Sequence, residues 1–349
     1  MSEYKAETEI EKERDELEKT VIENLMKNGF TVFMVSDSTA CFTIYARHPS
    51  STLLIKVIYM LREITEEQLY ELKRISQFLG GTPIIISKFL NKNQEMEDEL
   101  VYLKFGLPVV TITTFLSYLN RTLQPLVIHH RGSFYVQLDG KIIRNIRKEK
   151  KLSMGHLASM IGVSRRSVYE YERETTSASI ETAQELEKHL QAALIKPLPL
   201  FSWEFEFEKK EEFENIDLKG INEEIFDLLS KIGISDQFWP SKSPMDALTD
   251  NQPKKEKEKI DQTMLLYVTE KKTSKTLNEA KKIGNLGRAV LKKTMIITGF
   301  EPEEACIEGV PAFTITELLG LKSPEEIFRA WIKRRQEGIK GSDFRVEDE

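Results

Sequence analysis

The stretch KIIRNIRKEKKLSMGHLASMIGVSRRSVYEYERETTSASIETAQELEKHL, residues 141–190, decides how the rest of the chain is interpreted. Its apolar residues recur at helical spacing in short segments, and Ser153 and Ser164 each stand just before one of them. A serine hydroxyl there accepts a backbone amide of the first helical turn, so both serines mark helix starts. Two starts eleven residues apart leave room only for a tight turn, where Gly162 provides a left-handed residue. The stretch therefore predicts a helix-turn-helix.

The two short helices are expected to share one small core. Leu157, Ala158 and Ile161 fall on one face of the first helix, and Val168 and Tyr171 fall on one face of the second. Ala158 is small at the point where two helices would cross closely. We therefore expect these apolar side chains to be buried between the helices.

The charge of this stretch differs from that of the whole chain. Between Lys141 and Arg173 there are nine Lys or Arg and three Glu, a local charge of +6, whereas the whole chain carries −6. A basic island in an acidic protein favours phosphate binding at one place without general adhesion to nucleic acid.

Over about fifty residues the pattern resembles the DNA-binding domain of the Cro and phage-repressor family, also called the XRE family. The matching positions are Arg147, Leu152-Ser153, Leu157-Ala158, Gly162-Val163-Ser164, Val168, Tyr171-Glu172-Arg173, Ala183, Leu186 and Leu190. Glu174 and Ala178 depart from the family, which usually has Gly and often Pro at these places. The resemblance implies that the second helix, opening at Arg165, enters the major groove of double-stranded DNA.

The expected contacts with DNA are of two kinds. Residues at the start of the second helix would reach base edges, and an arginine paired bidentately with guanine contributes roughly 1–3 kcal/mol of discrimination. Arg147, Lys151, Ser153 and the amide of Met154 are better placed for phosphates. The predicted DNA-binding residues are Arg147, Lys151, Ser153, Met154, Ser164, Arg165, Arg166, Ser167, Tyr169 and Arg173.

Length and composition indicate a globular protein of two or three domains. The chain has 349 residues, of which 40% are hydrophobic and 30% charged. No apolar run approaches the roughly 20 residues of a membrane span, and the charged first twenty residues exclude a secretory signal, so we expect a cytoplasmic protein without a membrane partner. Cys41 and Cys306 are interpreted as buried thiols, and the five histidines show no metal-ligand spacing.

The segments on either side of the basic stretch repeat one another. GLPVVTITTFL at 106–116 and GVPAFTITELL at 309–319 are identical at six of eleven positions, and three looser echoes precede them in the same order. Helical and strand-like patterns alternate in both segments. The predicted fold class is therefore α/β, with mixed sheets in two similar flanking domains and an all-α helix-turn-helix domain between them.

This organisation predicts six parts with distinct roles. They are an α/β domain at 1–125, a hairpin connector at 126–140, the helix-turn-helix domain at 141–195, a linker at 196–219, a second α/β domain at 220–337 and a frayed tail at 338–349. The alternation from Phe201 to Phe207 predicts a strand in the linker, and the charged loop from Asp250 to Asp261 is expected to be mobile.

The order of elements in the first domain resembles the restriction-endonuclease-like fold of archaeal Holliday-junction resolvases. That resemblance implies a metal site built from an Asp on one strand and a Glu-x-Lys on the next, which phosphodiester hydrolysis requires. The three positions hold Thr43, Lys56 and Ile58 in the first domain, and Asp246, Tyr267 and Thr269 in the second. We therefore expect degenerate domains, with no catalytic residue, metal or cofactor, in a protein that is not an enzyme.

Taken together, the architecture resembles a family of archaeal HTH-type transcriptional regulators. The resemblance implies sequence-specific binding to double-stranded DNA, and a single helix-turn-helix reads about half a site, so a homodimer is expected. Two alternatives stay open at this point. In the first alternative, the chain is a metal-dependent nuclease or junction-processing enzyme. In the second, it is a regulator whose α/β domains sense a small molecule or a protein effector.

Overall fold

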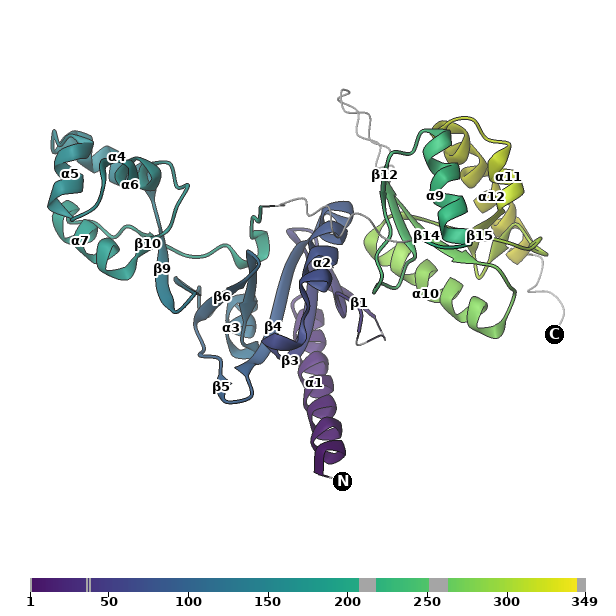
Figure 1. Cartoon of the computed structure of the whole chain (residues 1–349), viewed down its shortest axis with the longest axis horizontal. Coiled ribbons are helices and arrows are strands. Elements are labelled where there is room, and N and C mark those ends of the chain that lie inside the picture. The colour runs from purple at the N-terminus through teal and green to yellow at the C-terminus, as the bar shows by residue number, and fades with distance from the viewer. Residues whose placement is uncertain (1, 36, 38, 207–217, 251–262, 344–349) are drawn as a thin grey trace. The chain divides into compact units, whose positions relative to one another are not determined.

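The computed structural model describes residues 2–35, 37, 39–206, 218–250 and 263–343 (Figure 1). The chain divides into two compact units that do not follow chain order. The first comprises Met1–Gly29, Ile55–Ile64 and Thr82–Glu206, and the second comprises Phe30–Leu54, Thr65–Gly81 and Phe207–Glu349.

The N-terminal part is built on a mixed sheet. Its elements are α1 (Ser2–Lys27), β1 (Thr31–Met34), β2 (Ile44–His48), β3 (Ser51–Met60), a 3-10 turn (Leu61–Glu63), α2 (Glu66–Leu79), β4 (Thr82–Asn91), β5 (Gln94–Glu95), β6 (Leu100–Lys104), β7 (Leu107–Val110) and α3 (Ile112–Leu119). Leu53, Leu54 and Ile55 are fully buried, which fits the continuous apolar run of β3. The helix α2 begins at a capping box formed by Thr65 and Gln68.

The middle part is a hairpin followed by short helices. Its elements are β8 (Val127–His130), β9 (Ser133–Leu138), α4 (Gly140–Glu149), α5 (Met154–Met160), α6 (Arg165–Glu172), β10 (Ala178–Ser179), α7 (Ile180–Leu190), β11 (Ile195–Lys196) and a 3-10 turn (Leu200–Ser202). The strand β9 pairs antiparallel with β8, β10 and β11. Because β10 directly precedes α7 and β11 follows it, this pairing joins the hairpin to the helical region.

The C-terminal part forms a second mixed sheet with helices. Its elements are α9 (Ile221–Ile232), β12 (Asp236–Phe238), β13 (Ala247–Asp250), β14 (Met264–Thr269), α10 (Ser274–Val290), β15 (Lys293–Thr298), β16 (Cys306–Ile307), β17 (Val310–Thr314), α11 (Ile315–Leu319) and α12 (Pro324–Asp343). Apolar side chains from α9, α11, α12 and the strands make one core cluster, which includes Trp239, Phe313 and Trp331.

The two sheets share their topology. The strands of the first run β1-β2-β3-β4-β7-β6 before continuing to β8, β9 and β10, and those of the second run β12-β13-β14-β15-β17-β16. Ile85 pairs with Val109 in parallel between β4 and β7, and Ile296 pairs with Ala312 in parallel between β15 and β17. Ile85 and Ile296 are equivalent positions in the sequence repeat, and so are Val109 and Ala312. The predicted fold class, mixed α/β sheets flanking a helical domain, is confirmed.

The linker strand, the frayed tail and the charged loop predicted from the sequence have three different outcomes. The predicted strand at 201–207 is wrong over its described residues, because Phe201 lies in a 3-10 turn and packs against Phe115 and Tyr118. Its alternation reflects packing onto the preceding domain instead of strand pairing. The backbone of α12 continues beyond Gly338 to Asp343, so this part of the predicted tail is helical. The charged loop falls almost entirely on 251–262, outside the described residues.

Candidate nucleic-acid interface

Each of the four short helices follows a capping residue. The side-chain oxygen of that residue accepts a hydrogen bond from a backbone amide in the first turn of the helix. Ser153 Oγ accepts from His156 N at 3.0 Å, and Ser164 Oγ accepts from Ser167 N at 3.0 Å. Asp139 caps α4 and Ser179 caps α7 in the same way. These bonds satisfy amides that have no partner inside the helix, so the starts of α5 and α6 are fixed locally, as predicted.

The turn between α5 and α6 is tight and the core beneath it is apolar. Gly162 adopts φ +72°, and Val163 N donates to Ala158 O at 3.0 Å. An L side chain rarely adopts such a φ, which accounts for glycine here. The buried cluster contains Val136, Leu138, Ile143, Leu157, Ala158, Ile161, Val168, Tyr171, Ala178, Ala183, Leu186, Leu190 and Leu194. It includes all five apolar residues predicted for the core, together with two from β9.

Arg147 lies inside this domain, not on the surface where we expected a phosphate contact. It is 8% exposed, its guanidinium forms an ion pair and two hydrogen bonds with the Glu172 carboxylate, and its Nη1 donates to Leu152 O at 2.9 Å. Hydrogen bonding to Glu172 raises the pKa of Arg147 above its ordinary value. The prediction missed Glu172 as a partner, because the buried pair joins α4 to α6 across a distance in sequence that local patterns do not report.

A close backbone approach brings α4 against α6. A Cβ on Gly140 would lie 2.5 Å from Tyr171 O and 2.6 Å from Glu172 O, so only glycine fits at this helix start. Arg144 reinforces the contact by donating from Nη2 to Glu172 O at 3.1 Å. The helix α6 is therefore held firmly by α4, which leaves its other face free to meet a partner.

The exposed face of α6 carries most of the predicted base-reading residues. Arg166 Nε donates to Glu170 Oε1 at 2.8 Å, and Arg173 Nη1 donates to Tyr169 Oη at 2.7 Å. In the described part of the chain, Arg165 is exposed and forms no ion pair or hydrogen bond through its side chain. On this face, the Arg165 guanidinium can therefore meet a partner without breaking a contact in the described part of the protein.

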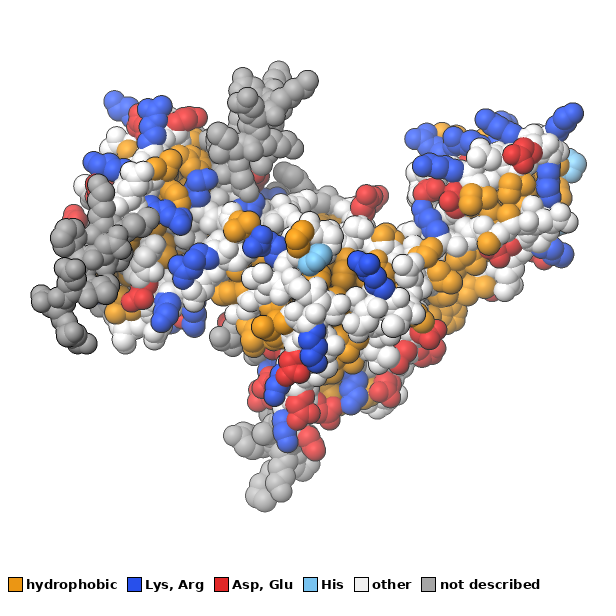
Figure 2. All heavy atoms as spheres, turned by 180° about the vertical axis from the view of Figure 1, so that it is seen from behind, with side chains coloured by type: hydrophobic (Ala, Val, Ile, Leu, Met, Phe, Trp, Pro, Cys, Tyr) orange, Lys and Arg blue, Asp and Glu red, His pale blue; other side chains and the backbone are white. Residues whose placement is uncertain are grey.

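The other predicted residues lie at the starts of α5 and α6 or just before α5. Lys151 is exposed and follows α4 with φ +55°, and Ser153 caps α5. Met154 is the first residue of α5, and its side chain packs against the core, so only its backbone amide is suited to a phosphate. Ser164 Oγ lies 2.9 Å from Ser167 Oγ beside the first turn of α6. Figure 2 shows Lys and Arg side chains gathered over this helical domain, at the upper right.

The departure at Glu174 has a structural consequence. This residue takes φ +59°, a left-handed conformation that glycine adopts without strain and that other L residues rarely adopt. Its carboxylate accepts from Gly140 N at 3.1 Å and forms an ion pair with Lys196. Glu174 therefore ties the exit of α6 to the start of α4 and to β11. Ala178, in β10, pairs with Val136 of β9.

Comparison with known proteins identifies both parts of this architecture. A family model described as a PD-(D/E)XK superfamily domain matches residues 14–125, and one described as helix-turn-helix matches residues 143–194. A protein named "Putative HTH-type transcriptional regulatory protein" from Pyrococcus abyssi is 31% identical over 82% of this chain and 87% of the relative. This chain belongs to that family of HTH-type transcriptional regulatory proteins.

Further relatives in this family have the same name. The protein from Methanocaldococcus jannaschii is 29% identical over 80% of this chain and 84% of the relative. The protein from Thermococcus kodakarensis is 28% identical over 93% of this chain and 98% of the relative. The chain thus combines a helix-turn-helix domain with a PD-(D/E)XK superfamily domain. None of its described helices has the length and apolar character needed to cross a membrane.

The nuclease positions of the regulator's first α/β domain are filled by residues unsuited to a metal. Thr43, Lys56 and Ile58 are 2%, 3% and 4% exposed, and Lys56 brings a positive charge to the place of the expected carboxylate. Among the described residues no group of three or more His, Cys, Asp or Glu could hold a metal ion. At these three positions, Thr43, Lys56 and Ile58 do not supply the carboxylate ligands and the lysine that the superfamily's metal-dependent motif implies.

The second α/β domain keeps one acid from that motif. Asp246 precedes β13, and its Oδ2 accepts from Val268 N at 2.7 Å. Burial raises the pKa of this carboxyl to about 6, against the lowering effect of that hydrogen bond. Tyr267 and Thr269 occupy the other two positions, and Thr269 Oγ1 donates to Lys271 O at 3.1 Å. Asp246 therefore accepts a hydrogen bond from the backbone of the neighbouring strand β14.

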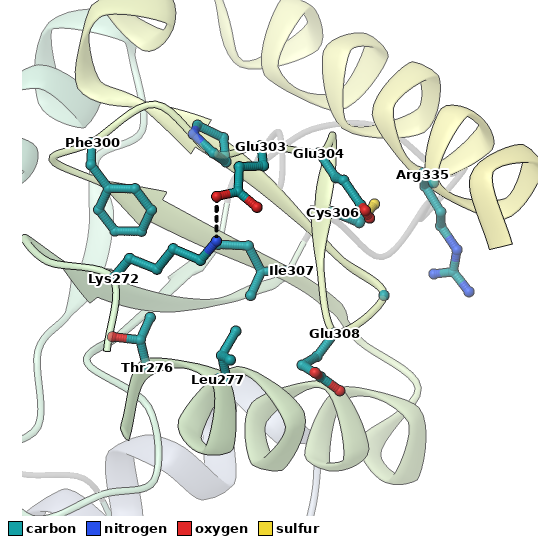
Figure 3. Close-up of a pocket in the computed structure, with 13 residues that line it drawn as sticks. Lys272, Thr276, Leu277, Phe300, Glu303, Glu304, Cys306, Ile307, Glu308 and Arg335 are labelled. Atoms are coloured by element: carbon teal, nitrogen blue, oxygen red, sulfur yellow. Dashed lines mark ion pairs between the residues drawn. The ribbon is translucent and has the colours of Figure 1, made fainter. Parts of the chain in front are cut away.

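A cavity of about 630 Å³ lies elsewhere in this domain. Figure 3 shows Lys272 and Glu303 facing each other across it, joined by an ion pair of 2.8 Å, with Thr276 and Leu277 of α10 on one side. Cys306 and Arg335 line its far end, and burial raises the pKa of the Cys306 thiol. Apolar and charged side chains thus share a hollow of the size that small ligands occupy.

Proposed function

We propose that the chain is a transcriptional regulator that binds double-stranded DNA sequence-specifically, with α6 in the major groove. The observation that carries this proposal is the exposed face of α6, where Arg165, Arg166 and Tyr169 point away from a helix whose opposite face is buried. A helix held by α4, with the Arg165 guanidinium free at its start, suits base reading, because Arg165 breaks no contact inside the described part of the protein to meet a base edge.

Phosphate contacts are proposed for the surface just before α5 and α6. Lys151 is an exposed cation, and the first amides of α5 and α6 lie beside Ser153 and Ser164. Such contacts fix the position of a helix in the groove without reading sequence. Arg147 is not included, because its guanidinium is fully engaged by Glu172 and Leu152.

Two substitutions test the division between base and phosphate contacts. Arg165→Ala is expected to weaken binding to the preferred site by about 1–3 kcal/mol while leaving random DNA unaffected. Lys151→Ala is expected to weaken both and to lower the slope of log K against log salt by about one. Fluorescence anisotropy with both duplexes over a salt series measures this. Equal losses on both duplexes in Arg165→Ala would contradict base reading.

We further propose that the regulator acts as a homodimer. One helix-turn-helix of this size covers about half a site, and useful affinity then requires two half-sites about one helical turn apart. Either α/β domain could supply the interface, and sedimentation of the full chain with and without DNA measures the assembly.

A second function, sensing of a small molecule, is favoured by the cavity between Lys272 and Arg335. Its two cations and three acids, Glu303, Glu304 and Glu308, suit a ligand that carries charge of both signs. Thermal shift of the full chain against zwitterionic metabolites tests this, with Lys272→Met as the matched variant. Stabilisation that Lys272→Met does not reduce would place the ligand elsewhere.

A further inference from the structure

The helix α10 and its flanks form a second basic island. Between Lys271 and Lys293 the sequence contains eight Lys or Arg and one Glu, a local charge of +7. This exceeds the +6 of the helix-turn-helix stretch and opposes the −6 of the whole chain. Because the remainder of the protein is acidic, a polyanion would be attracted to these two places and repelled elsewhere.

The basic residues of α10 are concentrated on its solvent side. The buried residues are Thr276, Ala280, Ile283, Gly284, Leu286, Gly287 and Val290. The polar residues on the exposed side, which we call the α10 face, are Lys275, Asn278, Lys281, Lys282, Asn285 and Arg288. At 3.6 residues per turn, Asn278 and Asn285 run along the middle of the α10 face, with cations on both flanks.

Few of these cations are neutralised. Glu279 pairs with Lys282 at 2.8 Å, and Arg288 Nη2 donates to Asn285 Oδ1 at 2.5 Å. Within the residues that the structure describes, Lys275 and Lys281 form no ion pair. A shallow depression of about 490 Å³ is lined by Ser274, Lys275, Asn278, Glu279, Lys281, Lys282 and Asn285. The α10 face therefore offers free ammonium groups around a polar hollow.

We propose that the α10 face is a second DNA-binding surface, which contacts the phosphate backbone without reading bases. From Lys275 to Arg288 it extends about 20 Å, and duplex DNA presents one negative charge per roughly 1.7 Å of axis. Lysine is a flexible point charge suited to phosphate, and an asparagine amide can donate to a phosphate oxygen. The middle of the face is amide, whereas the middle of a protein interface is enriched in aromatic side chains.

This inference rests on the proposed DNA binding and adds a domain to it. The helix-turn-helix would supply specificity, while the α10 face would supply affinity that depends on salt and not on sequence. The second α/β domain would then have a role in DNA binding that requires none of the nuclease residues it lacks.

The test uses the full chain with three cations of the α10 face removed, as Lys275→Gln, Lys281→Gln and Arg288→Gln together. The matched control removes the same charge from exposed positions outside the face, as Lys231→Gln, Lys322→Gln and Lys333→Gln together. Binding to a random duplex and to the preferred site is measured over a salt series. Thermal unfolding of both variants verifies that the fold is kept.

The α10 variant is expected to lose affinity for both duplexes by a similar factor, and its salt slope is expected to fall by about two to three. The control variant is expected to keep the slope of the unmodified protein. An unchanged slope in the α10 variant, with site binding still dependent on Arg165, overturns the inference and leaves the proposed function intact. That is also the outcome expected if the face binds an acidic protein.

A direct measurement complements the charge variants. A photo-crosslinking residue at Asn278 is expected to attach to random duplex, whereas the same residue at Glu224 of α9, which is also exposed, is expected not to. Equal crosslinking at both positions overturns the inference. Absence of any DNA binding by the unmodified full chain overturns both this inference and the proposed function.

Discussion

Arg147 shows how burial changes the role of a charged residue. Removing one member of a buried ion pair leaves the other charge without compensation, which costs roughly 3–5 kcal/mol. We therefore expect Arg147→Met to destabilise the helix-turn-helix by up to that amount, because Glu172 would stay buried with a side-chain exposure of 1% and would keep only its ion pair of 3.5 Å with the more exposed Arg144.

Chemical unfolding of the full chain, followed by circular dichroism, measures this loss. The neighbouring exposed residue supplies the control, since Lys148→Met should change stability by less than about 0.5 kcal/mol. A stable Arg147→Met variant that binds DNA weakly would instead restore the phosphate role first assigned to Arg147.

Asp246 makes the stability of the second α/β domain depend on pH. Its pKa in the folded protein is about 6, above the ordinary value of 3.8. A raised pKa means that protonated Asp246 stabilises the folded state below about pH 4, and that this contribution is lost as the pH rises through about 6.

Asp246→Asn keeps a neutral acceptor for Val268 N and cannot ionise. Relative to the unmodified protein, the variant should therefore gain stability between about pH 4 and pH 7, by at most about 3 kcal/mol. Unfolding free energies at the two pH values test this, and a difference that does not change with pH would refute the assignment.

At the scale of elements, the exit of α6 depends on Glu174 in a left-handed conformation. Replacing Glu174 by Ala or Gly removes the same contacts with Gly140 and Lys196, but only Ala keeps a Cβ at φ +59°. Glu174→Ala should therefore be less stable than Glu174→Gly by about 1 kcal/mol. Thermal unfolding compares the pair, and equal stabilities would show that the backbone relaxes when the carboxylate is lost.

For the whole molecule, the arrangement of DNA sites reports on assembly. If the regulator binds as a homodimer, sites selected from random duplex DNA by the full chain should contain two inverted half-sites with centres about one helical turn apart. Arg165→Ala should relax base preference at the same position of both half-sites. Selected sites with one unrepeated half would contradict the dimer.

Much of the fold and of the α6 surface was predictable because the signals involved are local. Ser153 and Ser164 cap the helices they precede, and helical spacing places Leu157 and Val168 in the core. The identical positions at 106–116 and 309–319 revealed that both sheets follow one plan, which their strand order bears out.

The sequence by itself determined where the helices of the DNA-binding domain start, which apolar residues meet, and that two similar domains flank it. Only the tertiary structure decided what the charged residues do. Arg147 and Glu172 are 25 residues apart and meet only when α4 packs on α6, and Glu174 reaches Lys196 only when β11 pairs with β9. Helix caps and periodicity act within a few residues, whereas the environment of a charge depends on partners from distant segments.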